Sequence, residues 1–149
     1  MNTYTKQELH SILEQHRLWL ENKGGKRAIL TRADLSDIDL QGVDLRRANL
    51  IRTNFSNSNL TGSDLSDADI TYANFNNSCL NDVLFQDADL RNADMSFAKM
   101  FNVNLKRADL YRTNFDNAYL DNAALIAPRL EHTIIKLRGT NKSDCFTSK

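Results

Sequence analysis

The chain has 149 residues, of which 41% are apolar and 26% are charged. These are the proportions of a soluble globular domain and not of a disordered or membrane-spanning chain. Nineteen basic residues balance nineteen acidic ones, so the overall charge favours neither nucleic acid nor a membrane as a partner. The first residues, MNTYTKQELH, lack the basic and apolar regions of a signal peptide, and we expect a cytoplasmic protein.

The first predicted element is a helix that starts after Thr5. Thr5 and Glu8 have the spacing of a capping box, which satisfies free N–H groups of the first turn. Apolar residues, together with His16, then recur at helical spacing: Leu9, Ile12, Leu13, His16, Trp19 and Leu20. One such stripe is typical of a helix that covers a core, and a partner-binding helix is the alternative. We interpret His16 as a packed histidine and expect Gly24-Gly25 to end the helix. Residues 1–27 form this capping segment.

A repeat of five residues follows and continues without insertion. Every fifth residue is large and apolar: Leu30, Leu35, Leu40, Leu45, Leu50, Phe55, Leu60, Leu65, Ile70, Phe75, Leu80, Phe85, Leu90, Met95, Met100, Leu105, Leu110, Phe115, Leu120, Leu125 and Leu130. A period of five fits neither the 3.6 of a helix nor the 2.0 of a strand. The repeat therefore predicts a different, regularly repeating architecture.

The other positions of the repeat indicate how the chain turns. Two residues before each large residue stands a small one, usually Ala, Ser or Thr, and Ile38 and Pro128 are larger exceptions. A spacing of two puts the small and the large residue on the same side of an extended backbone. The residue between them is usually Asp or Asn, which stabilise turns by bonding the backbone two residues on. Each pentapeptide is thus a short side followed by a bend, and the chain should close into a solenoid.

The pentapeptides ADLSD, ANLIR, ADLRN and ADLYR resemble the A(D/N)LXX motif of the pentapeptide-repeat proteins. The resemblance covers residues 28–137 and implies a right-handed quadrilateral β-helix with four pentapeptides per coil. The residues alone leave the number of sides open. RRANLIRTNFSNSNL at 46–60 matches KRADLYRTNFDNAYL sixty residues later, and sixty divides by fifteen as well as by twenty. The pairs Phe55/Phe75 and Gly42/Gly62 favour twenty.

The C-terminal part of the chain keeps the register through Thr133 and Ile135. It is dense in apolar residues: Leu125, Ile126, Leu130, Ile134, Ile135 and Leu137. This density is compatible with an irregular final coil, a cap, or a homodimer contact at the C-terminal end. Residues 138–149, rich in Lys, Ser and Thr, are expected to be a disordered tail.

We assign no catalytic, cofactor-binding or metal-ligating residue. The three histidines lie far apart in sequence, the two cysteines (Cys79 and Cys145) form no zinc motif, and no phosphate-binding or nucleophile motif is present. Paired aspartates are explained by the repeat as turn formers. A filled solenoid without inserted loops also offers no obvious pocket, so we expect a protein that is not an enzyme.

Four sides per coil sort the charged residues by face, named here after the central residues of their pentapeptides. Face 1 is centred on Leu35, Phe55, Phe75, Met95 and Phe115, and face 2 on Leu40, Leu60, Leu80, Met100 and Leu120. Together they carry seven aspartates against Lys99: Asp34, Asp37, Asp39, Asp82, Asp94, Asp116 and Asp121. Face 3, centred on Leu45, Leu65, Phe85 and Leu105, has balanced charges. Face 4, centred on Leu30, Leu50, Ile70, Leu90 and Leu110, has five basic and four acidic residues, too few cations for direct nucleic-acid binding.

The outer faces therefore carry the functional hypotheses. Aromatic or apolar residues occupy outward positions in two clusters, one of Phe97, Lys99, Phe101 and Tyr119, the other of Ile51, Tyr72 and Tyr111. Such clusters favour a protein-interaction module or scaffold whose partner is an unidentified protein.

The alternative follows from the resemblance, which implies that some members mimic duplex DNA and bind a type II topoisomerase, DNA gyrase, thereby modulating quinolone sensitivity. The candidate mimic residues are Asp37, Asp82, Asp116 and Asp121. A duplex ~25 Å long carries on the order of fifteen phosphate charges, about three times the net charge of this solenoid.

Overall fold

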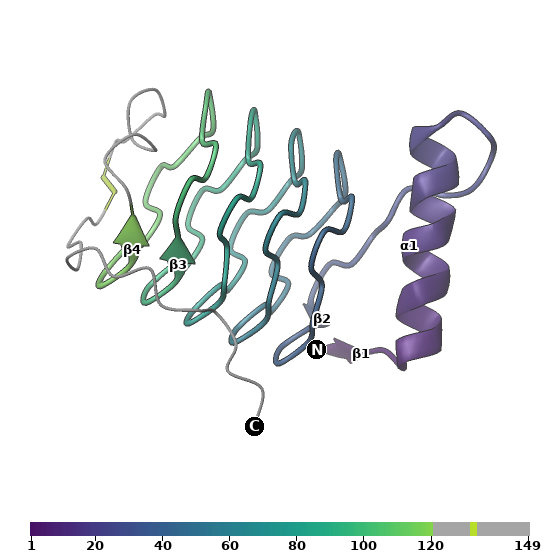
Figure 1. The fold of residues 1–149 in the computed structure, drawn as a ribbon, viewed down its shortest axis with the longest axis horizontal. Helices are drawn as coiled ribbons and strands as arrows, with labels where there is room; N and C mark the ends of the chain where they lie inside the picture. Colours follow the sequence, from purple (N-terminus) through teal and green to yellow (C-terminus); the bar gives the residue numbers. More distant parts are fainter. Residues whose placement is uncertain (121–131, 134–149) are drawn as a thin grey trace.

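The computed structural model describes residues 1–120 and 132–133. A short strand β1 (Asn2–Thr3) leads into helix α1 (Lys6–Leu20), and the strands β2 (Ala33–Asp34), β3 (Lys99–Met100) and β4 (Tyr119–Leu120) follow. Figure 1 shows successive coils stacked side by side from β2 to β4, with α1 lying across the N-terminal end of the stack. The apolar residues of the C-terminal part and the predicted tail lie outside the described residues.

The ladder between coils decides the number of sides. Parallel bridges join Ile29 to Asn49, Asp34 to Asn54, and Asp39 to Asn59, and the same twenty-residue step holds along the stack to Lys99 and Tyr119. A coil thus contains four pentapeptides, and the alternative of three is wrong. The predicted right-handed quadrilateral β-helix with an N-terminal capping helix is confirmed. The structure has few strands of two or more residues, because most straight sides contribute a single bridging residue.

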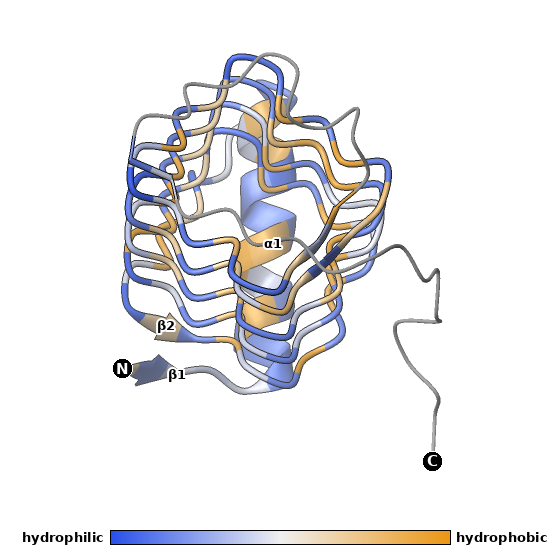
Figure 2. Ribbon diagram, turned by 90° about the vertical axis from the view of Figure 1, so that its left-hand side faces the viewer, coloured by the Kyte–Doolittle hydropathy of each residue, from blue (hydrophilic) through white to orange (hydrophobic). Residues whose placement is uncertain are grey.

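The core of the solenoid is built by the residues expected to point inward. Figure 2 looks along the stack and shows apolar and polar positions alternating around each coil. Phe55 and Phe75 are fully buried and stack with ring centroids 4.9 Å apart, and Phe85 meets Phe75 edge to face at 6.0 Å. Each such buried side chain contributes about 1.5–3 kcal/mol of gross stabilisation.

Hydroxyl side chains at the small inward position are also buried, and each has a partner. Thr53 Oγ1 donates to Leu30 O at 2.7 Å and Ser63 Oγ to Leu40 O at 2.9 Å. Because these hydrogen bonds satisfy the buried hydroxyls, Ser and Thr can replace Ala in the interior at little cost.

Most bends are tight turns closed by the backbone. The N–H of the residue three places after a central residue donates back to it, as in Ala33 N to Leu30 O at 2.9 Å. The turn-forming role of the Asp/Asn position is confirmed, since Asp39 Oδ1 accepts from Gln41 N at 3.2 Å. The last residue of each described pentapeptide has a positive φ, as at Gly42 (68°) and Asn57 (58°), the left-handed conformation that Gly, Asn and Asp adopt most readily.

Several pentapeptides place an unfavourable residue at this left-handed position. The described examples other than Gly, Asn, Asp and His are Arg32, Arg47, Arg52, Tyr72, Phe97, Arg107 and Arg112. A side chain without a short polar group costs roughly 1–2 kcal/mol in this conformation. The backbone conformation at the left-handed position is therefore not stabilised by these residues.

Helix α1 begins as predicted but ends differently. Thr5 N donates to Glu8 Oε2 at 2.7 Å and Glu8 N to Thr5 Oγ1 at 3.2 Å, which confirms the capping box. At the other end Asn22, with φ of 56°, takes the left-handed position, and Lys23 N donates to Leu18 O at 2.9 Å. The prediction that Gly24-Gly25 end the helix is wrong, because Asn22 already closes this C-terminal motif.

Gly25 has another role, the return of the chain along the helix. A Cβ there would lie 2.2 Å from the carbonyl oxygen of Gln15. The next residue, Lys26, donates its N–H to that same oxygen at 3.0 Å. Only glycine allows this close approach.

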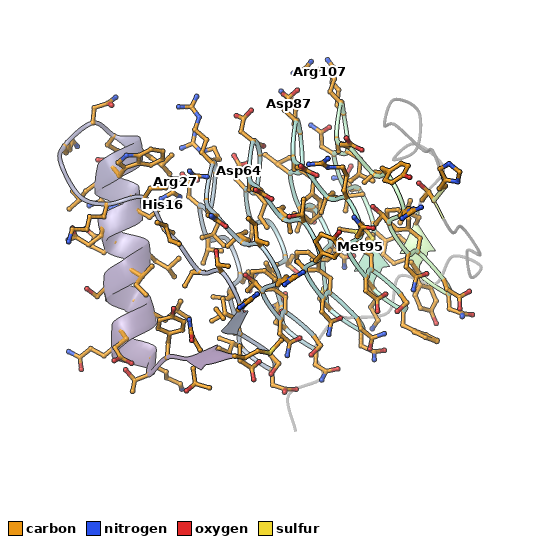
Figure 3. All side chains as sticks on the ribbon, turned by 180° about the vertical axis from the view of Figure 1, so that it is seen from behind. His16, Arg27, Asp64, Asp87, Met95 and Arg107 are labelled. Carbon is orange, nitrogen blue, oxygen red and sulfur yellow. The ribbon has the colours of Figure 1, made fainter. Side chains whose placement is uncertain are left out.

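His16 attaches α1 to the first coil and is, as expected, a packed residue. Its side chain is fully buried and stacks on Trp19 with centroids 5.5 Å apart. Nδ1 accepts the N–H of Ala28 at 3.0 Å, so Nε2 carries the proton and donates to Arg46 O at 3.0 Å. Figure 3 shows His16 between the helix and the coil.

The buried His16 should make the stability of the protein depend on pH. Burial lowers the pKa of His16 below its usual value, so the unfolded chain binds a proton more readily than the folded one. This contribution to the free energy of unfolding is present above about pH 6.5 and is lost as the pH falls through the folded pKa. Thermal unfolding of the wild type should therefore show a lower Tm at pH 5 than at pH 7.

His16→Phe should remove most of this pH dependence. It should also destabilise the protein at pH 7 by about 1–3 kcal/mol, because the Ala28 N–H and the Arg46 carbonyl lose their partner. His10→Phe, at an exposed position of the same helix, serves as the control and should retain the wild-type pH profile. Equal stability of the wild type at both pH values would contradict this role.

Replacement of an unfavourable left-handed residue should stabilise the fold. We expect Arg32→Asn to raise the free energy of unfolding by ~1 kcal/mol, because Asn tolerates the positive φ that Arg32 has. Arg91→Asn is the matched control, since Arg91 lies one place earlier in its turn and bonds Asp89. Urea denaturation measures both, and an unchanged or lowered stability of Arg32→Asn would rule out the strain.

Candidate interaction faces

Charged side chains on face 3 are neutralised by one another. Arg46 Nη2 lies 2.6 Å from Asp44 Oδ2, and Arg107 Nη2 lies 2.5 Å from Asp87 Oδ2 on the preceding coil. Figure 3 shows the Arg107–Asp87 pair at the outer edge of neighbouring coils. The guanidinium of Arg107 holds the pKa of the Asp87 carboxyl below its usual range. These exposed pairs add little stability, but they leave face 3 with few unpaired charges.

Face 4 differs because three of its arginines have no ion-pair partner among the described residues. Arg32, Arg52 and Arg112 are exposed and occupy the last, left-handed position of their pentapeptides. Together with Tyr72 in the same position they form a row along one corner, which we call the arginine column. Successive coils are about 4.8 Å apart, and Asn92 occupies this position in the coil between Tyr72 and Arg112.

Aromatic rings contact two of the three arginines in the arginine column. The guanidinium of Arg52 lies 5.3 Å from the ring centroid of Tyr72, and that of Arg112 lies 5.1 Å from Tyr111. Tyr111 in turn meets His132 edge to face at 5.4 Å. Cation–π contacts of this kind hold a guanidinium in place without neutralising its charge.

The predicted cluster of Ile51, Tyr72 and Tyr111 therefore lies beside these arginines. Tyr72 is 54% exposed, whereas Ile51 and Tyr111 are partly buried. Arg91 is bound by Asp89, with Nη2 and Oδ2 2.5 Å apart, and so does not add to the unpaired charges. The three residues are spread along face 4, with Ile51 and Tyr111 three coils apart, and the arginines are the main chemical feature there.

The other predicted cluster is divided by the structure. Lys99 in β3 and Tyr119 in β4 are register partners and lie side by side, and both are partly buried. Phe97 is 39% exposed and lies at the preceding corner. Phe101 is only 6% exposed, so it offers little surface to a partner.

Several aspartates on faces 1 and 2 serve the scaffold. Asp34, Asp39 and Asp94 each accept a hydrogen bond from the Asn side chain twenty residues later, at 3.0–3.1 Å. Their carboxylates also cap their own turns. These three residues therefore have a structural role whatever else they do.

The four candidate mimic residues have different surroundings. Asp37 and Asp82 are exposed, and Asp82 accepts a hydrogen bond from Asn102 Nδ2 at 2.7 Å. Asp116 is half-buried, and its Oδ1 is buried without a hydrogen-bond partner in the described part of the chain. Asp121 lies outside the described residues. Within the described part, faces 1 and 2 carry six aspartates against Lys99.

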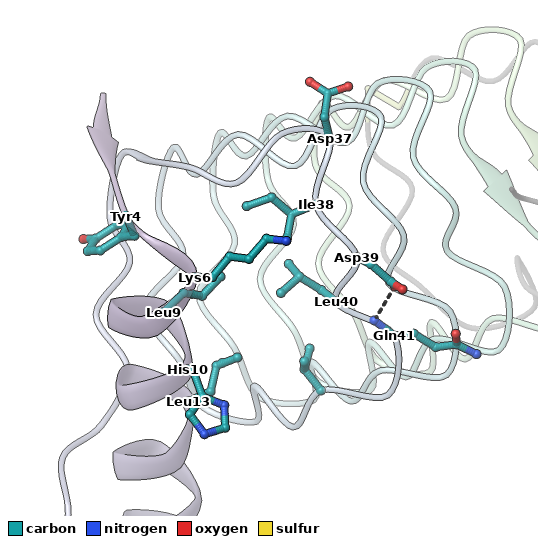
Figure 4. A pocket seen from close by; sticks show the side chains of 11 residues that line it. Tyr4, Lys6, Leu9, His10, Leu13, Asp37, Ile38, Asp39, Leu40 and Gln41 are labelled. Carbon is teal, nitrogen blue, oxygen red and sulfur yellow. Dashed lines mark hydrogen bonds between the residues drawn. The ribbon is translucent and has the colours of Figure 1, made fainter. Parts of the chain in front are cut away.

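A hollow that we did not expect lies between α1 and the first coil (Figure 4). Its volume is about 520 Å³. Residues from the N-terminal segment and from the first coil line it: Tyr4, Lys6, Leu9, His10, Leu13, Asp37, Ile38, Asp39, Leu40, Gln41 and Val43. The expectation of no pocket is thus corrected, because the hollow forms where coil stacking stops and a helix takes over. The sequence contained one indication that the first coil is irregular at this place, because Ile38 is a large residue at an inward position that is normally small.

The described residues were also compared with the requirements of a metal site and of a membrane-spanning helix. Among them, no three His, Cys, Asp or Glu side chains converge as a metal site. No helix in the described part is long and apolar enough to cross a membrane.

Two solved structures illustrate what this chain is similar to. A trypsin-treated R167E form of QnrB1, a plasmid-mediated fluoroquinolone resistance protein, has a TM-score of 0.60 and 16% identity, over 72% of this chain and 55% of that one. This chain thus spans about half of the QnrB1 structure. HetL of the cyanobacterium Nostoc sp. strain PCC 7120, a pentapeptide repeat protein involved in heterocyst differentiation regulation, is 25% identical over 74% of this chain and 67% of that one, with a TM-score of 0.37.

At these identities the likeness to QnrB1 shows the fold alone. No curated protein sequence is similar enough to this chain to count as a relative. The sequence profile of the pentapeptide repeats, however, matches in overlapping segments that run from residue 28 to residue 134. With most of its length matched and its coils twenty residues long, this chain belongs to the pentapeptide-repeat family.

Proposed function

We propose that this protein is a non-enzymatic interaction module that binds an acidic protein surface through the arginine column of face 4. One observation carries the proposal: three exposed guanidiniums, of Arg32, Arg52 and Arg112, stand in a row without an ion-pair partner among the described residues. Each occupies a backbone position where Asn or Gly would suit the fold better.

The chemistry of the arginine column suits carboxylates. A guanidinium binds a carboxylate through two parallel hydrogen bonds, and Arg and Tyr are enriched among the residues that dominate protein interfaces. Because the coils fix the backbone positions of these residues, little backbone entropy is lost when a partner binds.

The same face disfavours nucleic acid. Asp69, Asp89 and Asp109 lie on face 4 close to the arginines, and Asp89 and Asp109 lie 2.5 and 3.9 Å from Arg91. A polyphosphate backbone would meet these carboxylates and be repelled. A protein partner can place its own carboxylates beside the arginines and avoid the aspartates.

A triple variant tests the proposal. Arg32→Gln/Arg52→Gln/Arg112→Gln should fold normally and lose binding by about a hundredfold or more, at roughly 1–2 kcal/mol per charge-assisted contact. The partner is first captured with the wild type, identified by mass spectrometry, and then titrated in purified form against each variant.

The matched control removes three arginines that are already paired, as Arg46→Gln/Arg91→Gln/Arg107→Gln. This control should bind as the wild type does. A partner that binds the first triple variant with unchanged affinity, or that is lost equally from both, would refute the assignment to the arginine column.

A second candidate function is mimicry of duplex DNA toward a type II topoisomerase, with DNA gyrase as the partner. It is favoured by the six described aspartates on the adjacent faces 1 and 2, where Lys99 is the one cation in the described part. Three of these carboxylates are bound into turns and side-chain ladders, so the mimic depends on Asp37, Asp82, Asp116 and Asp121.

A supercoiling assay with purified gyrase decides this candidate. The wild type at micromolar concentration should inhibit the enzyme or protect it from a quinolone, and Asp→Asn changes at the four mimic residues should abolish the effect because they remove the negative charge. Asp67→Asn on face 3 is the control and should act as the wild type. Absence of any wild-type effect at micromolar concentration would end this candidate.

A further inference from the structure

The first coil leaves a strand edge open on face 2. In later coils this edge is paired with the coil before it, as in Asn59 N to Ile38 O at 3.0 Å and Cys79 N to Ser58 O at 2.9 Å. Asp39 occupies the same place in the first coil, and neither its N–H nor its C=O has a backbone partner on that side among the described residues. An unpaired edge of this kind can accept a further strand.

The edge is covered on the neighbouring sides of the same coil. On face 1, β1 pairs with β2, with Asn2 opposite Ala33. On face 3, His16 Nε2 donates to Arg46 O and Arg27 Nε to Arg47 O. Face 2 is thus an opening between two protected sides.

The hollow described above lies along this open edge (Figure 4). Leu9 and Leu13 of α1 form one wall, and Ile38 and Leu40 belong to the coil. Leu13 and Ile38 are only partly buried, so apolar surface remains available. A volume of about 520 Å³ lies within the usual range of ligand-binding pockets.

Charge on the rim restricts what can enter. Asp37 and Asp39 are exposed at the coil side of the hollow and form no ion pair among the described residues, while Lys6 and His10 line its helix side. An extended segment that continues the ladder would place its outward side chain beside Asp39, where a cation is favoured.

The chain itself contains a segment with these properties. Ile38–Gly42 reads IDLQG, and Ile135–Gly139 reads IKLRG. The two segments share Ile, Leu and Gly at the first, third and fifth places, and a basic residue replaces the acidic Asp39. Within residues 28–134 no other pentapeptide of the repeat has Ile two places before its large central residue.

We propose that residues 135–139 of a second copy of this chain bind to the open edge as an added parallel strand. In that register Lys136 lies beside Asp39, while Ile135 and Leu137 extend the apolar layer of Ile38 and Leu40. Gly139 then takes the left-handed position held by Gly42 (φ 68°) in the coil.

The segment must come from a second copy because its own chain cannot reach. Thr133 is anchored at the far end, where its hydroxyl donates to Leu110 O at 2.8 Å. Thr133 lies five coils away from the coil of Ala33, a distance of ~24 Å. The two residues of extended chain from Thr133 to Ile135 span only ~7 Å, which is too short to reach the first coil. The resulting contact is heterologous, so copies associate head to tail.

Charge reversal in the full-length protein tests this contact. Sedimentation of the wild type should show a mass that exceeds the monomer and rises with concentration. Asp39→Lys or Lys136→Asp should weaken the association about tenfold, because an attractive cross-strand pair becomes repulsive. The double variant Asp39→Lys/Lys136→Asp should restore it.

The variants are chosen so that the fold survives. Lys99 already occupies the place of Asp39 three coils further on, so a lysine is compatible with this position. Asp82→Lys, which reverses an exposed charge on face 2 away from the hollow, is the control and should associate as the wild type. Circular dichroism melts confirm that each variant is folded.

A synthetic peptide of residues 133–139 gives an independent measurement. It should bind the full-length protein, and Asp39→Lys should weaken its binding about tenfold more than Asp82→Lys does. A monomeric wild type at all concentrations, an association indifferent to the charge reversals, or failure of the peptide to bind at millimolar concentration would each overturn the proposal. None of these measurements involves the arginine column, so their outcome does not test the proposed function.

Discussion

The backbone ladder between residues twenty apart is the interaction on which everything else in this protein depends. A straight side is only one or two bridging residues long, so no single strand is stable by itself and the coils must stack in strict register. An inserted residue would turn every following side chain from the core to solvent. The uninterrupted spacing of the large apolar residues is therefore a requirement of the fold.

This constraint leaves few places for function. The central and the small inward residues are buried, and the Asp or Asn between them is bound into turns and into side-chain ladders such as Asn54 on Asp34. Variation is possible mainly at the two turn positions. The last of these has a positive φ, so an arginine there costs stability, and the arginine column on one corner supports the proposed role in recognition.

The two ends of a solenoid differ from its middle, because their ladders have no neighbour. At the N-terminal end three contacts protect the first coil. Strand β1 pairs with β2, His16 binds the coil from the helix, and Arg27 reaches the Arg47 carbonyl. This protection is unequal around the coil. The side of Asp39 stays open beside an apolar hollow, so the gap in the ladder and the proposed binding site coincide.

The sequence by itself determined the solenoid, the capping helix and the burial of His16, because these follow from local spacing that repeats or from one stripe. Spacing alone could not distinguish three sides from four, since that depends on which residues pair across coils. It also favoured Gly24-Gly25 as the end of the helix, although the nearer Asn22 closes it. Tertiary structure decided that Phe101 is buried, that Arg32, Arg52 and Arg112 have no ion-pair partner among the described residues while Arg46, Arg91 and Arg107 do, and that a hollow opens beside Asp39. The physical reason is that pairing and exposure depend on neighbours twenty residues away or on another element, which local spacing does not specify.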